Sequence, residues 1–135
     1  MIKDFLLKIE HGLDFTYKEI QKNVFSLQVN DKIEVKIEVL EKDFILHSDF
    51  FVLGDEKKEE LFSYLMMANF LGYGTGRGKI GLDNETNMIT LSKQMNREIK
   101  YEEFYEILEE FINYVSYWQK EIINFIEKQK ENIFS

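Results

Sequence analysis

Apolar and polar residues alternate between Phe25 and Val39, and this pattern limits the fold more than any other feature of the chain. The alternation is interrupted only at Asn30-Asp31-Lys32, which supplies residues typical of a turn. A period of two places the apolar side chains on one face of a β-strand and the polar ones on the other. The sequence therefore predicts an antiparallel hairpin with one buried face and one solvent-exposed face.

Apolar residues at helical spacing predict three helices around these strands. The predicted helices cover residues 2–12, 56–71 and 104–126, and further strands are predicted at 44–53 and on either side of the turn residues Asn84–Asn87. The predicted order is α-β-β-β-α-β-β-α. This order corresponds to an α+β fold in which a twisted antiparallel sheet carries helices packed on it.

Composition and charge exclude several classes of protein. The 135 residues are expected to form one domain, residues 1–135, around a single core. The net charge of −8 repels the phosphates that nucleic-acid binding requires, and the absence of cysteine excludes disulfides and thiolate chemistry. Asp4, Lys8 and Glu10 interrupt the region where a signal peptide would be apolar, and no long apolar run follows. We therefore expect a cytoplasmic protein that binds neither nucleic acid nor membrane.

A glycine-rich stretch contains five of the seven glycines between Gly72 and Gly81, and Gly76, Gly78 and Gly81 are spaced as G-x-G-x-x-G. In a dinucleotide-binding site these glycines follow a strand and open a helix, whose N-terminus holds the phosphates. Here they follow a predicted helix and lead into a predicted strand. We interpret the stretch as a tight turn in which Gly72 ends the second helix. A small enzyme that binds a nucleotide or phosphate through these glycines is one competing hypothesis for the function.

Other residues give no sign of catalysis, of a metal site or of a cofactor site. The run Asp83–Asn87 resembles the start of a calcium loop, but Met88 replaces the glycine and Gln94 the glutamate that such a loop needs. His11 and His47 lie far apart, with no third ligand at metal-binding spacing. The glutamates from Glu102 to Glu110 lie opposite the apolar stripe and predict a solvated acidic face. We expect no catalytic residue, no cofactor and no metal.

The amount of apolar surface indicates self-association. Aromatic residues make up 15% of the chain, and three helices and about five strands each present an apolar face. One small sheet cannot cover all of these faces, and a symmetric dimer would bury the excess.

The second half of the chain resembles a known family. The segment LFSYLMMANFLGYGTGRGKIGLDNETNMITLSKQM, followed by a long helix with EEFINYVSYWQKEI, is similar to the class I chaperones of bacterial type III secretion, which include the Tir chaperone. The most specific part is Leu65-x-x-x-Asn69-x-x-Gly72, running through the glycines to Gly81-Leu82-Asp83. The resemblance implies a homodimer in the bacterial cytoplasm that holds the N-terminal region of a secreted effector extended and delivers it to the export machinery. The secretion ATPase is a further candidate partner.

The resemblance also suggests roles for particular residues. It assigns the second helix to the dimer interface, with Leu61, Leu65, Met66 and Phe70 as the contact residues. An extended peptide can add a strand to a sheet edge or lie in a groove between helix and sheet. The candidate effector-binding residues are Ile2, Phe5, Leu6, Ile9, Phe25, Leu27, Ile33 and Val35, for which the alternative is an ordinary core role. The alternative function is a regulatory or adaptor protein of the same fold that is not tied to secretion.

Overall fold

The structure is a computed structural model that describes residues 2–12, 15–54, 58–72 and 74–134. The described residues form three α-helices, one 3₁₀ turn and six strands. In chain order these are α1 (Ile2–Gly12), β1 (Thr16–Gln21), β2 (Val24–Asn30), β3 (Ile33–Val39), β4 (Asp43–Val52), α2 (Lys58–Asn69), η1 (Phe70–Gly72), β5 (Lys79–Asp83), β6 (Met88–Asn96) and α3 (Tyr101–Phe134).

All six strands form one antiparallel sheet in the order β1-β2-β3-β4-β6-β5. β1 and β5 are therefore the two edge strands. β3 follows the predicted alternation, because Ile33, Val35, Ile37 and Val39 are buried whereas Glu34 and Glu38 are exposed. A bulge at Phe50 interrupts the register between β4 and β6.

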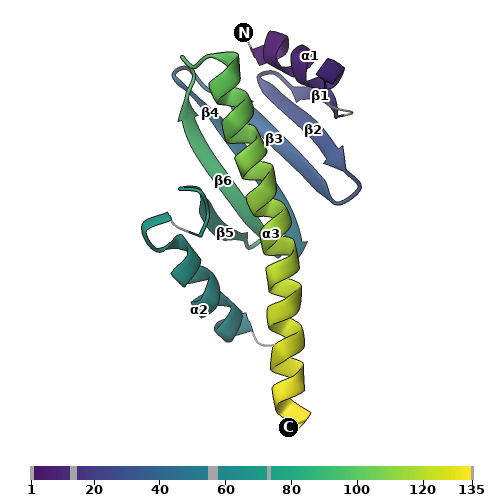
Figure 1. The fold of residues 1–135 in the computed structure, drawn as a ribbon, viewed down its shortest axis with the longest axis vertical. Coiled ribbons are helices and arrows are strands. Elements are labelled where there is room, and N and C mark those ends of the chain that lie inside the picture. Colours follow the sequence, from purple (N-terminus) through teal and green to yellow (C-terminus); the bar gives the residue numbers. More distant parts are fainter. Residues whose placement is uncertain (1, 13–14, 55–57, 73, 135) are drawn as a thin grey trace.

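The helices pack on one another and on the sheet (Figure 1). α3 crosses the sheet diagonally. α1 lies near the first turns of α3, and α2 lies beside β5 and the lower half of α3. Phe104 on α3 joins two of these layers, because its ring centroid lies 5.2 Å from that of Phe5 on α1 and 5.9 Å from that of Phe44 on β4. These three rings lie in the core between the two helices and the sheet.

The predicted α+β fold class is confirmed, and the structure adds one strand. β1 was not predicted, because most of its side chains are exposed and the segment shows no alternation of apolar and polar residues. The predicted first residue of the second helix, Glu56, lies outside the described residues, and α2 is described from Lys58. Asp83 at the end of β5 pairs with Met88 at the start of β6, which confirms that the run predicted as a turn, Asn84–Asn87, closes a hairpin.

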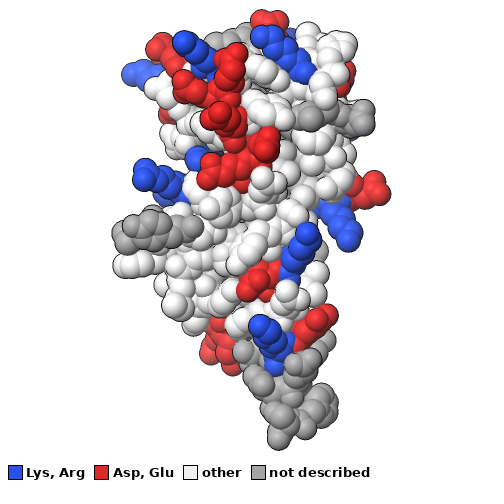
Figure 2. All heavy atoms as spheres, in the orientation of Figure 1, with Lys and Arg blue, Asp and Glu red and all other residues white. Residues whose placement is uncertain are grey.

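The acidic side of the last helix is solvated, as the sequence predicts. Glu102, Glu103, Glu106, Glu109 and Glu110 are all exposed. Figure 2 shows acidic side chains clustered over the upper part of the molecule, where the first turns of α3 lie. Within the described ranges, none of the helices combines the length and the hydropathy required to cross a membrane.

Candidate partner-binding surfaces

The outer edge of β1 is open along the described chain. β1 pairs with β2 on one side, and five of its six side chains are exposed. Among the described residues, no hydrogen bond outside the sheet ladder involves Thr16–Gln21. An edge of this kind presents unpaired N–H and C=O groups to which another extended chain can pair. The structure therefore offers a place for strand addition beside α1.

The predicted effector-binding residues lie in the interior. Ile2 and Phe5 are 9% and 8% exposed, and the other six are 3% exposed or less. They belong to the core that includes α1, β2 and β3. These eight side chains therefore pack beneath the surface formed by α1, β2 and β3, and they do not line an open groove. A direct role in effector binding stays a prediction for all eight residues.

The predicted dimer residues divide into two pairs. Leu61 and Leu65 are 1% and 4% exposed and pack inside the chain, whereas Met66 and Phe70 are 72% and 70% exposed. Met67, which is not among the predicted contact residues, is 77% exposed. Three large apolar side chains therefore project into solvent from the end of α2 and from η1. We refer to Met66, Met67 and Phe70 as the α2 patch.

The glycine-rich loop is packed against its surroundings. Its main-chain N–H groups at Gly74, Thr75, Arg77 and Gly78 all donate to carbonyl oxygens of residues between Ala68 and Thr75. Gly76 adopts a φ of 58°, and a Cβ atom there would lie 2.6 Å from the ring of Tyr114. Four amides that a phosphate would need are thus already bonded within the chain, which removes the main support for a phosphate-binding loop.

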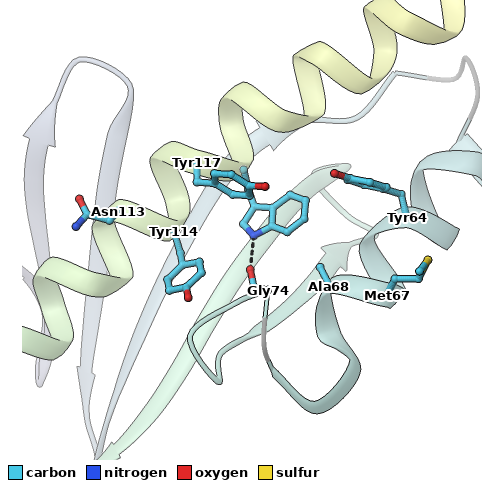
Figure 3. Close-up of a pocket in the computed structure, with 8 residues that line it drawn as sticks. Tyr64, Met67, Ala68, Gly74, Asn113, Tyr114 and Tyr117 are labelled. Atoms are coloured by element: carbon cyan, nitrogen blue, oxygen red, sulfur yellow. Dashed lines mark hydrogen bonds between the residues drawn. The ribbon is translucent and has the colours of Figure 1, made fainter.

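An aromatic pocket lies between α2, α3 and the glycine-rich loop (Figure 3). Its volume is about 530 Å³, and its rings come from Tyr64, Tyr114, Tyr117 and Trp118. Trp118 is buried and its indole Nε1–H donates to the carbonyl oxygen of Gly74 at 2.8 Å, which fastens the loop to α3. The pocket is adjacent to the α2 patch, because Met67 also lines it.

Tyr64 connects α2 with the second half of α3. Its hydroxyl donates to a carboxylate oxygen of Glu121 at 2.5 Å, and its ring stacks on Phe125 with centroids 5.0 Å apart. Burial, followed by the hydrogen bond and the charge of Glu121, raises the pKa of Tyr64 to about 12. Tyr64 therefore stays protonated and keeps its donor role throughout the physiological range.

Titratable side chains elsewhere in the described residues form no metal-binding cluster. His47 pairs with Asp49 on the same strand, with 2.7 Å between Nε2 and Oδ1. No group of three or more His, Cys, Asp or Glu side chains in the part of the chain that the structure describes could hold a metal ion. Asp83 and Asn87 order the β5–β6 turn, since the Asn87 N–H donates to the Asp83 carbonyl at 2.7 Å.

Sequence reasoning missed two features of these surfaces. β1 has no apolar alternation, although the Lys22-Asn23 turn after it is a detectable signal and Asn23 indeed has a φ of 65°. Met67 stands next to Met66 in a helix that is apolar on several sides, so spacing alone did not distinguish its outer face.

Comparisons with known proteins agree on one family and one fold. The family model of the Tir chaperone protein (CesT) family matches residues 3–119. A comparison with curated protein sequences finds no match.

Three solved structures share the fold at low sequence identity. The ExoU–SpcU heterodimeric complex from the type III secretion system of Pseudomonas aeruginosa has a TM-score of 0.66 at 14% identity, covering 92% of this chain and 96% of the other. The ExsC–ExsE complex has a TM-score of 0.67 at 19% identity, covering 88% and 91%. The HopA1–SchA chaperone–effector complex has a TM-score of 0.66 at 9% identity, covering 88% and 93%.

Proposed function

Because the chain belongs to the Tir chaperone protein (CesT) family, we propose that it is a cytoplasmic chaperone for effectors of a bacterial type III secretion system. It binds the N-terminal region of an effector, keeps that region extended and delivers it to the export apparatus, where the secretion ATPase is the candidate receiver. The observation that carries this proposal is the family match over residues 3–119. The similarity in fold to a chaperone–effector complex supports it.

The open edge of β1 is the proposed site for an extended effector segment. Strand addition uses main-chain hydrogen bonds, which any sequence without proline can make, and gains specificity from pockets beside the edge. α1 contacts β1 and covers the core next to this edge. The buried residues Phe25, Leu27 and Val35 anchor β2 and β3 in the core, and β1 pairs with β2.

The α2 patch is the proposed homodimer contact. Three exposed side chains at the end of one helix form an apolar surface of the kind that monomeric proteins seldom leave uncovered. A two-fold axis would pair the patch with its own copy. Met66 and Phe70 are then the contact residues of the predicted set, while Leu61 and Leu65 hold α2 on the chain's own core.

Capture of a partner from the native organism tests the function. Tagged protein is used to isolate bound partners, the complexes are treated with protease, and the protected fragment is sequenced. We expect one stretch near the N-terminus of a partner to survive while the rest is cleaved. A partner that is protected as an intact folded domain contradicts the chaperone function and favours the regulatory or adaptor alternative.

Hydrogen exchange on the captured complex locates the binding edge. We expect the main-chain amides within Thr16–Gln21 that face away from β2 to become protected on binding, because a strand paired to the free edge of β1 would accept from them. The amides of Phe44–His47 on the central strand β4 are the internal control, since this part of β4 is already paired on both sides. Protection confined to other elements would contradict strand addition at β1.

A further inference from the structure

Residues of the same chain already pair with the first part of the β5 edge. The side-chain amide of Asn69 on α2 pairs with the main chain of Ile80 in both directions. Its Nδ2 donates to the Ile80 carbonyl oxygen at 2.9 Å, and its Oδ1 accepts from the Ile80 N–H at 2.8 Å. One side chain thus makes the two hydrogen bonds that a neighbouring strand would make at this residue.

Thr75 makes an equivalent pair at Gly78, two residues earlier. The Gly78 N–H donates to the Thr75 carbonyl oxygen at 3.0 Å, and the Thr75 hydroxyl donates to the Gly78 carbonyl oxygen at 2.7 Å. In an antiparallel sheet, alternate residues direct both main-chain groups to the same side. Ile80 on β5 faces away from β6, and Gly78, which directly precedes β5, continues the same alternation; the main-chain groups of both residues are already bonded.

Packing holds Thr75 and the loop that carries it in place. Thr75 is 2% exposed, and a Cβ atom added at Gly78 would lie 2.8 Å from the carbonyl oxygen of Ser92 on β6. The loop therefore lies directly against the sheet. The bond from Trp118 to Gly74 fastens the same loop to α3. The loop that carries Thr75 is therefore held by contacts with both β6 and α3.

We propose that Asn69 and Thr75 close the β5 edge against strand addition, so that an extended peptide is directed to the opposite edge at β1. The glycine-rich stretch then has a defined role, because its tight path carries Thr75 back to the start of β5. The direction to β1 rests on the proposed function. The closure of the β5 edge depends on the hydrogen bonds alone.

The first test measures amide exchange in the native protein by nuclear magnetic resonance. Ile80 and Leu82 are both expected to face the edge, and only Ile80 is paired with Asn69. We expect the Ile80 amide to exchange about tenfold more slowly than the Leu82 amide, as one net hydrogen bond predicts. Equal exchange rates would overturn the closure.

The second test asks where an extended peptide binds. The probe is a capped synthetic peptide of alternating threonine and valine residues, titrated into isotope-labelled protein. In the native protein we expect shifts at β1 and none at residues 78–82. The double variant Asn69→Ala/Thr75→Val removes both side-chain bonds at Ile80 and the hydroxyl bond at Gly78, and there we expect shifts at residues 78–82 as well. The control Thr75→Ser keeps the hydroxyl and should behave like the native protein.

The outcomes separate the two parts of the proposal. Shifts at residues 78–82 in the native protein, or none there in the double variant, would overturn the closure, even if the variant melts at a lower temperature. New shifts at residues 78–82 in the variant without any at β1 would keep the closure and contradict the proposed effector site. If the double variant does not fold, Thr75→Val alone should produce the shift at Gly78, and its absence would overturn the closure.

Discussion

Replacing Phe70 by aspartate should dissociate the proposed dimer into folded monomers. Phe70 is 70% exposed in the chain, so it contributes little to the chain's own core. Leu65→Asp, one turn and a half earlier in the sequence, should instead unfold the protein, because Leu65 is 4% exposed and the new carboxylate would be buried without a partner. The two variants thus separate dimer contact from core packing on neighbouring turns.

The expected size of the effect follows from the exposed area of Phe70. A phenylalanine buries roughly 200 Å² when it is fully covered, and 70% of the residue is still exposed in one chain. About 140 Å² per subunit is then available for contact, which at about 25 cal/mol per Å² contributes about 7 kcal/mol across a two-fold interface before the unfavourable terms are included. Losing even about 3 kcal/mol of this weakens the dimer by about 100-fold.

Light scattering during size-exclusion chromatography measures the mass of each variant, and circular dichroism measures its melting. We expect the native protein to be dimeric at micromolar concentration and Phe70→Asp to be monomeric with native helix content. Ile123→Asp is the matched control, because Ile123 is a 47% exposed apolar residue on α3, outside the α2 patch. A dimeric Phe70→Asp variant, or a monomeric control, would refute the assignment of the interface to the α2 patch.

Three further changes test the packing around the glycine-rich loop. Gly76→Ala should lower the free energy of unfolding by about 2–4 kcal/mol, because alanine is strained at a positive φ and its Cβ would clash with Tyr114 on α3. Gly54→Ala is the control, because a Cβ at Gly54 meets nothing within 4 Å. Equal denaturant midpoints for the two alanine variants would contradict this. Trp118→Phe should cost about 2–4 kcal/mol by leaving a void and an unpaired loop carbonyl, and an unchanged denaturation midpoint would show that the indole hydrogen bond does not stabilise the fold. Because burial and then Glu121 raise the pKa of Tyr64 from 10.0 to about 12, its contribution to stability is complete below pH 10 and is lost as the pH rises toward 12. Tyr64→Phe should therefore melt with a shallower pH dependence in that window, and identical slopes for both proteins would contradict the pairing.

The fold could be predicted where burial imposes a period on the sequence. β3 lies between two other strands and has one buried face, so its alternation is complete. β1 lies at the edge and has little buried surface, so its fold does not require apolar residues at alternate positions of Thr16–Gln21. The missing strand was therefore the one least determined by packing.

The residues predicted for a dimer interface show the same limit for a helix. α2 is apolar on more than one side, because one side packs on the chain's own core and another is exposed. Spacing identifies both sides as apolar and does not reveal which neighbour covers each. The separation of Leu61 and Leu65 from Met66 and Phe70 needed the tertiary structure.

The two edges of the sheet pose one physical problem with two solutions. A chaperone that binds an extended chain by strand addition needs an open edge, yet every open edge also invites pairing between copies of the protein. In this chain the β5 edge is bonded by Asn69 and Thr75, which leaves β1 as the edge without such bonds among the described residues. The motif Leu65-x-x-x-Asn69-x-x-Gly72 then has a physical reading: Leu65 anchors α2, Asn69 caps β5, and Gly72, with a φ of 72°, turns the chain back toward the sheet. The residues that identified the family from sequence are thus residues that restrict strand addition to one edge.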